Sequence, residues 1–185
     1  MTTTATKPIH EIAPFQNERV KDFKDPADAS AMRSALEVVK RELGKHYPLV
    51  IGGRKIETEK KIRSLNPANP DEVVGLTSAA SKQQASDAIE AAVRAFESWR
   101  RLSLPERATY IFKAAEVLRA RRFEYDALLV YEVGKSWVEA DGDIAEAIDF
   151  LEFYAREALR YAQPQPVVPL DGERNELVYI PLGVG

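Results

Sequence analysis

The chain has 185 residues, 45% of them hydrophobic and 30% charged, and its 29 acidic residues outnumber 26 basic ones for a net charge of −3. The basic residues are not pooled, which argues against a nucleic-acid partner. The sequence has no cysteine and no apolar run long enough for a signal peptide or a membrane span, so we expect a cytoplasmic protein with no membrane partner and no disulfide or thiol chemistry in these residues.

The N-terminal residues predict an arm followed by a helix. Residues 1–24 are polar with scattered prolines, and are expected to lie on something else or to be loose. Asp25 and Pro26 form a helix-start signal, because the acid caps free N–H groups and proline suits the first helical position. Apolar residues then recur at helical spacing from Met32 to Leu43, and Gly44 predicts the end of the helix.

Short strands are expected next. Gly52-Gly53 separates Leu49–Ile51 from Arg54–Ile56, and two central glycines accept the positive φ of a tight hairpin turn. Further strands are expected at 61–65 and 73–78, on either side of a proline-rich turn at 66–70.

Four more helices follow from start signals and apolar periodicity. Ser81 and Ser103 each begin a capping-box pattern, in which a serine and a Gln or Glu three residues later satisfy each other's backbone N–H groups. A helix at 123–133 precedes the longest one, at 136–163, which contains no proline and only one glycine.

The longest predicted helix has two different faces. One carries apolar residues at helical spacing and should be buried. The other carries large aromatics among carboxylates: Glu139, Glu146, Phe150, Phe153 and Glu157. Two interpretations remain open, a core helix with a solvated acidic flank and a helix whose Glu146 faces a pocket.

The last residues return to a strand-like pattern. Val167–Leu170 and Leu177–Ile180 flank an Asp171-Gly172 turn, which predicts a β-hairpin within 164–181. An isolated hairpin is marginal in water, so this one is expected to need a partner from elsewhere in the protein or from another chain. Exposed apolar residues such as Val168 would otherwise promote association.

No reaction centre is visible from residue types and spacing, so we assign no catalytic, cofactor-binding or metal-binding residue on this basis. His10 and His46 lack zinc-helix spacing and a visible nucleophile partner, and His46 is expected to be a structural or surface residue rather than a catalytic one. A carboxylate cluster lacks calcium-loop spacing and is expected to be a solvated helix start: Glu139, Asp141 and Asp143. A basic cluster is expected at a helix end, where cations favour the carbonyl dipole: Arg119, Arg121 and Arg122.

Several stretches together resemble the aldehyde dehydrogenase superfamily. In chain order they are SLNPAN at 64–69, EVVG at 72–75, AAVRAFESW at 91–99, Arg107, EVGKS at 132–136, Glu139-Ala140 and YIPLGV at 179–184. Other stretches are similar to its branch of 1-pyrroline-5-carboxylate dehydrogenases: HYPLVI at 46–51, WVEA at 137–140, AEAIDF at 145–150, YAR at 154–156 and GERN at 172–175. The resemblance covers the chain from about residue 15 to its last residue.

The resemblance implies an α/β parent fold with a Rossmann sheet, which this mainly helical segment with β-hairpins would precede. Residues 25–163 would be the N-terminal part of the NAD-binding domain, and 182–185 the beginning of the Rossmann core. The 164–181 hairpin would belong to the oligomerisation flap, which packs against a second copy. Glu146 would border the aldehyde pocket as a substrate contact.

The resemblance also implies an activity, the NAD-dependent oxidation of L-glutamate γ-semialdehyde to L-glutamate in proline degradation. That chemistry uses a cysteine thiolate, an asparagine that holds the oxyanion and a glutamate that activates water. The family places these residues beyond the position of Gly185, so we expect an N-terminal fragment that is inactive alone. Two alternatives are a non-catalytic interaction module that keeps the assembly surface, and another aldehyde dehydrogenase branch with a different substrate.

Overall fold

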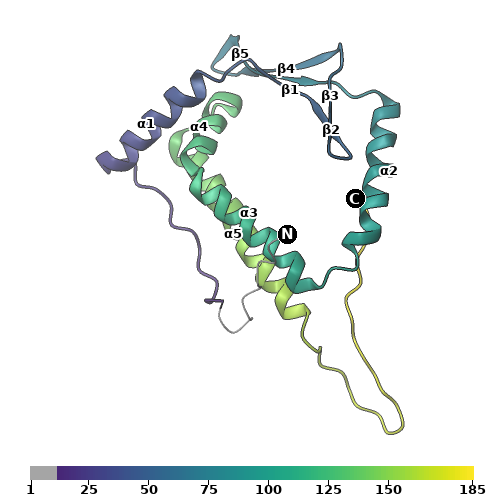
Figure 1. The fold of residues 1–185 in the computed structure, drawn as a ribbon. Helices are drawn as coiled ribbons and strands as arrows, with labels where there is room; N and C mark the ends of the chain where they lie inside the picture. Colours follow the sequence, from purple (N-terminus) through teal and green to yellow (C-terminus); the bar gives the residue numbers. More distant parts are fainter. Residues whose placement is uncertain (1–11) are drawn as a thin grey trace, which may run out of the picture.

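The computed structural model describes residues 12–185, so His10 and the first part of the predicted arm lie outside it (Figure 1). The helices are α1 (Pro26–Lys40), α2 (Lys82–Trp99), α3 (Leu104–Ala120), α4 (Arg122–Val133) and α5 (Trp137–Tyr161). The strands are β1 (Lys45–Tyr47), β2 (Leu49–Ile51), β3 (Arg54–Ile56), β4 (Lys61–Asn66) and β5 (Asn69–Ser78). None of the helices in residues 12–185 combines the length and apolar character that a bilayer span requires.

The predicted helix starts are confirmed by their cap geometry. The Asp25 side chain accepts a hydrogen bond from the Ala27 N–H at 2.8 Å, which caps α1. Ser81, Ser103 and Ser136 each form a complete capping box, at the start of α2, α3 and α5. These contacts are local in sequence, so a pattern of four residues is enough to predict them.

Two small sheets lie at one end of the molecule. β2 and β3 form the predicted antiparallel hairpin, and Gly52 and Gly53 have φ angles of 57° and 77°, the left-handed conformation that the turn requires. The other sheet has the strand order β1-β5-β4, with β1 parallel and β4 antiparallel to β5.

The predicted turn at 66–70 is too long, because β5 already begins at Asn69. The Asn66 side chain shortens the connection: its Oδ1 accepts from the Ala68 N–H at 2.9 Å, and its Nδ2 donates to Glu72 at 2.7 Å. Pro70 is tolerated near the start of the strand, where a missing N–H costs least. β1 was not predicted as a strand, because its three residues are too few to show a period.

The helices other than α2 form one bundle. α3 and α4 pack along α5, and α1 packs on α4. Met32 and Ala127 are fully buried between α1 and α4, while Ala115 and Ile148 are fully buried between α3 and α5. The alanines allow the helix backbones to approach closely, so the large apolar side chains fill the space between the helices.

α2 stands apart from this bundle (Figure 1). Its main contact is with β2, and none of its residues is buried. Ile89 and Val93, from the stripe that predicted the helix, are 60% and 50% exposed. The apolar face of α2 is therefore open in this structure.

The predicted hairpin within 164–181 is not formed. The Glu173 N–H donates to the Leu170 carbonyl at 3.1 Å, which makes the turn, but neither arm belongs to a strand in the described part of the chain. The two arms instead form a long extended loop (Figure 1). A two-stranded ribbon is marginal without a further surface to pack on, and Pro164, Pro166 and Pro169 cannot donate to a ladder.

Candidate functional site

The candidate site is built on α5, which carries Glu146 near its middle. The Ser136 capping box fixes where the helix starts, and the buried residues Ile144 and Ile148 fix which side faces the bundle. Glu146 lies on the exposed side. At about 100° per residue, it projects between Phe150, four positions later, and Phe153, seven positions later. The predicted Glu146 side of α5 is therefore an open face carrying two large aromatics, which are 52% and 41% exposed.

Next to this open face of α5, on the side of Phe150, lies an apolar groove between α3 and α5, with a volume of about 710 Å³. Its walls include Leu104 and Ile111 from α3, and Phe150, Leu151 and Tyr154 from α5. Glu146 does not line it, although its neighbour Ala147 does. Arg107 also reaches the groove, and its Nε is buried without a hydrogen-bond partner in residues 12–185.

On the opposite side of this face, next to Phe153, lies the segment 12–24, called here the N-terminal strap. Asp149 accepts two hydrogen bonds from it, from the Glu18 N–H at 2.6 Å and from the Asn17 Nδ2 at 2.8 Å. Farther along α5, Arg156 donates from Nε to the Ala13 carbonyl at 3.1 Å. The described part of the predicted arm thus lies against α5 and is held by polar contacts.

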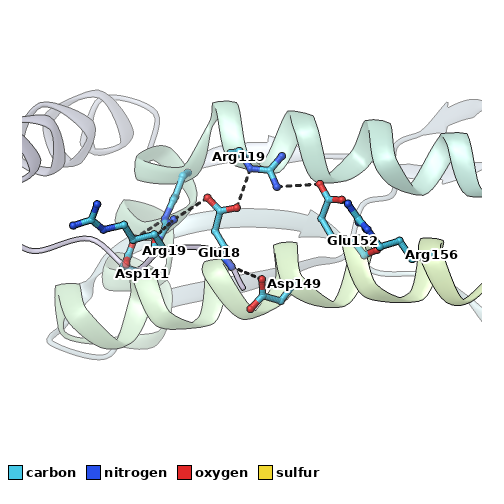
Figure 2. A network of polar contacts seen from close by, with 8 residues as sticks. Glu18, Arg19, Arg119, Asp141, Asp149, Glu152 and Arg156 are labelled. Atoms are coloured by element: carbon cyan, nitrogen blue, oxygen red, sulfur yellow. Dashed lines mark hydrogen bonds and ion pairs between the residues drawn. The ribbon is translucent and has the colours of Figure 1, made fainter. Parts of the chain in front are cut away.

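A network of ion pairs joins the strap to α3, α4 and α5 (Figure 2). Glu18 pairs with Arg119 at 2.9 Å and with Arg122 at 3.4 Å. Arg119 continues to Glu152 at 3.0 Å, which also accepts from Arg156 at 2.6 Å. Burial by itself would raise the pKa of the Glu152 carboxyl group. The hydrogen bonds from Arg156 and Arg119 have the larger combined effect, so the pKa of Glu152 lies below its ordinary value.

One part of this network is buried. Arg122 donates from Nε to Asp141 at 2.6 Å, and their side chains are only 4% and 1% exposed. Asp141 also accepts from the Lys21 N–H at 2.7 Å, and Arg122 donates to the Arg19 carbonyl at 2.9 Å. The buried pair therefore fixes the strap as well as the junction of α4 and α5.

Asp126 adds a second carboxyl group to this buried cluster. Its two oxygens and the Nη2 of Arg122 are buried and have no hydrogen-bond partner among the described residues. Burial, followed by the charge of Asp141, raises the pKa of Asp126 to about 7. A proton on Asp126 removes the repulsion between the Asp126 and Asp141 carboxylates. The folded state is therefore more stable when Asp126 is protonated, at a pH below its pKa.

The charged clusters expected from the sequence separate in the structure. Asp141 is buried rather than solvated, Glu139 completes the Ser136 capping box, and Asp143 pairs with Lys135. No group of carboxylates or histidines in residues 12–185 could hold a metal ion. The basic cluster also divides: Arg119 and Arg122 hold the strap, and Arg121 forms an exposed pair with Glu124. Sequence reasoning missed the strap network because its partners are more than 100 residues apart.

His46 has two partners that the sequence did not reveal. Its Nδ1 lies 3.0 Å from Glu57 and its Nε2 lies 3.1 Å from the Ser78 hydroxyl. This order of groups resembles a hydrolytic triad, but Ser78 is 3% exposed and its oxygen also accepts from Thr58 and Lys61. A substrate carbonyl has no access to that oxygen, so the cluster joins β1, β4 and β5 as a structural contact.

The described residues do not fit a bound dinucleotide. A pyrophosphate needs free backbone N–H groups, usually at a glycine-rich turn that opens a helix. Here the starts of α1, α2, α3 and α5 carry their own capping side chains, and the start of α4, which has no side-chain cap, follows α3 directly at Arg121 without a glycine-rich turn. We therefore assign none of residues 12–185 to NAD binding.

Comparison with known proteins shows the family of this chain and how much of its relatives the chain spans. Residues 54–185 match the model of the aldehyde dehydrogenase family. Over 171 residues the chain is 50% identical to "1-pyrroline-5-carboxylate dehydrogenase 2" of Bacillus subtilis. The aligned region covers 92% of this chain and 33% of that protein. A 1-pyrroline-5-carboxylate dehydrogenase from Geobacillus thermodenitrificans is 47% identical over 94% of this chain and 34% of its own length.

Solved structures show the same relation. The chain superposes on the 1-pyrroline-5-carboxylate dehydrogenase from Thermus with bound NAD with a TM-score of 0.88 and 50% identity, over 93% of this chain and 34% of that one. The proline utilization A protein of Bdellovibrio bacteriovorus gives a TM-score of 0.83 and 36% identity, over 91% and 17%. The chain spans about a third of the length of the curated relatives it matches. Because the family model covers most of its residues, the chain belongs to the aldehyde dehydrogenase family.

Proposed function

We propose that these residues are the N-terminal third of an NAD-dependent dehydrogenase that oxidises L-glutamate γ-semialdehyde, the open form of 1-pyrroline-5-carboxylate, to L-glutamate in proline degradation. The observation that supports this most is 50% identity, over almost all of this chain, to a protein with that named activity. The bound NAD in the Thermus structure supports NAD as the cofactor of the whole enzyme, and the cytoplasm is its expected compartment.

In this proposal the segment supplies one wall of the aldehyde pocket. Glu146 is an exposed carboxylate on the outer face of α5, beside Phe150. A carboxylate at that place can attract the amino group of an amino-acid aldehyde, while the aromatic side chain covers its aliphatic part. The nucleophile must come from elsewhere in the enzyme, because the sequence given has no cysteine.

The extended loop at 164–181 is proposed as an assembly element of a homo-oligomer. Val168 and Ile180 are each 77% exposed, although both are strongly apolar. Packing of these arms on a second copy would cover them and provide the surface that a ribbon needs.

The activity is tested by assaying NADH formation with the semialdehyde, for the 185-residue chain and for the full-length enzyme that contains it. We expect no turnover by the chain alone and turnover by the full-length enzyme. Turnover by the chain alone contradicts the proposal. Activity of the full-length enzyme only on other semialdehydes would favour a different branch of the family.

Glu146→Gln tests the pocket assignment. In the full-length enzyme it should raise KM for the aldehyde about tenfold with little change in KM for NAD, because a charge-assisted contact to substrate is lost. Glu97→Gln, which neutralises an exposed glutamate on α2, is the matched control and should change neither constant. Co-expression of the chain with full-length subunits tests the interaction module, and co-elution from a sizing column would favour it.

A further inference from the structure

The N-terminal strap is fixed to α5 on both sides of Phe15. Two residues before Phe15, the Ala13 carbonyl accepts from Arg156 at 3.1 Å. Two and three residues after it, Asn17 and the Glu18 N–H donate to Asp149 at 2.8 and 2.6 Å. The short segment between these anchors has little freedom, so the place of the Phe15 ring on α5 is set by the backbone.

From Phe15 a continuous row of aromatic rings crosses the outer face of α5. The Phe15 ring meets the Phe153 ring edge to face at a centroid distance of 5.5 Å. Phe153 meets Tyr154 at 5.3 Å, and Tyr154 stacks on Phe150 at 5.9 Å. Phe15 is half-buried and the other three rings are exposed. These four rings, Phe15, Phe153, Tyr154 and Phe150, are called here the aromatic row.

The aromatic row passes beside Glu146. Phe150 and Phe153 project on the two sides of Glu146, and the strap and the α3–α5 groove lie beyond them. An exposed phenylalanine on a helix surface is free to change rotamer unless a neighbour restricts it. The ring that restricts Phe153 from the strap side is Phe15.

We propose that strap residues 13–18 are a positioning element of the aldehyde-binding wall, with Phe15 as the positioning residue and Asp149 as the residue that fixes the strap. Phe15 holds Phe153, and through Tyr154 it holds Phe150 in the orientation that covers the substrate. This proposal rests on the proposed function, because it needs the Glu146 face to border the aldehyde pocket. The ion-pair network around Glu18 stabilises the strap but does not contact the aromatic row.

The kinetic test uses the full-length enzyme with Phe15→Ala. An edge-to-face contact that orients a substrate wall should be reflected in aldehyde binding, so KM for the aldehyde should rise about three- to tenfold while KM for NAD stays unchanged. Phe15→Tyr keeps the ring and should restore the original KM. Val20→Ala, at a 61% exposed strap residue away from the row, is the control and should have no effect.

A second measurement works on the 185-residue chain without any turnover. In aromatic carbon–proton correlation spectra, Phe15→Ala should shift the ring signals of Phe153, Tyr154 and Phe150, and Val20→Ala should leave them in place. Asp149→Ala should shift the same signals, because it releases the strap. Ring signals that stay in place in both variants overturn the proposal, even if the variants are less stable.

The two proposals fail in different ways. If Glu146→Gln leaves KM for the aldehyde unchanged, the pocket assignment fails and the positioning role fails with it. If Glu146→Gln raises KM but Phe15→Ala does not, only the positioning role is overturned. A loss of thermal stability in Phe15→Ala with unchanged kinetic constants also overturns it, because that result is a purely structural effect.

Discussion

α5 and α2 begin with the same device and end in different surroundings. Both helices open with a complete serine capping box, and both carry apolar residues at helical spacing. Yet α5 has seven buried residues, including Ile144 and Ile148, and α2 has none. Amphipathic periodicity therefore shows which face of a helix can be buried. It does not show which other element, if any, packs against that face.

The two helices also differ in their charges. α5 uses Asp141, Asp149 and Glu152 to bind the strap and neighbouring helices. The ion pair on α2, between Arg94 and Glu90, is local and exposed. Because exposed pairs contribute little to stability, the polar contacts that matter should all lie on the α5 side.

The largest effect is expected where this contrast is greatest, at Arg122. Arg122→Ala leaves Asp141 as a buried charge without its cation, and should lower the free energy of unfolding by about 3–5 kcal/mol. Arg121→Ala, next to it but in an exposed pair with Glu124, is the control and should have little effect. Urea unfolding of both variants measures the difference, and equal losses would show that burial does not distinguish the two arginines.

The apolar contacts should show the same contrast between the helices. Ile148→Ala creates a cavity under α5 and should destabilise the chain by about 2–5 kcal/mol, because Ile148 is fully buried. Ile89→Ala on α2 removes a 60% exposed side chain and should change stability by less than about 0.5 kcal/mol. A comparable loss for Ile89→Ala would mean that its face is covered in solution.

The buried Asp126 should make the stability of the α4–α5 junction depend on pH. Its pKa is raised from 3.8 to about 7, so the folded chain keeps a proton that the unfolded chain releases. This contribution is fully present below the unfolded pKa and is lost as pH rises toward 7, so the free energy of unfolding should fall between about pH 4 and pH 7 and level off above that.

Asp126→Asn tests this directly. The amide cannot ionise and has nearly the same shape as the protonated acid, so the fall in stability over that range should largely disappear. Unfolding curves at several pH values compare the variant with the original chain. An unchanged pH profile would show that Asp126 is not the source of the fall. Glu152 cannot be that source, because its lowered pKa makes stability rise with pH.

The smallest effects are expected at the helix caps. Ser136→Ala removes the α5 capping box and should lower the free energy of unfolding by about 0.5–2 kcal/mol, because α5 is part of the core. Ser81→Ala should instead increase hydrogen exchange at the start of α2 with little change in the global unfolding midpoint. A shift of the midpoint by Ser81→Ala would show that α2 unfolds together with the bundle.

Most elements of this fold could be predicted because their signals are local. Asp25, the capping serines Ser81 and Ser103, and Gly52-Gly53 each act within about four residues, and each is found where predicted. The 164–181 arms show the limit of such signals. Asp171 and Gly172 do form a turn, but strand pairing needs a surface that the local sequence does not supply.

The candidate site was predictable only in part. Glu146 could be placed on an open face of the long helix from periodicity, and its role in a pocket stays a proposal. The strap network was not predictable, because Glu18 and Arg122 are 104 residues apart and neither differs from an ordinary surface charge in sequence.

By itself the sequence determined where most of the helices begin, which face of each is apolar, and the family to which the chain belongs. It placed the end of the first helix at Gly44, whereas α1 ends at Lys40. Only the tertiary structure decided that Asp141 and Asp126 are buried, that the strap lies on α5, and that the apolar face of α2 stays open. The physical reason is range. Caps and turns are satisfied by neighbours along the chain, whereas burial and ion pairing depend on which distant surfaces the fold brings together.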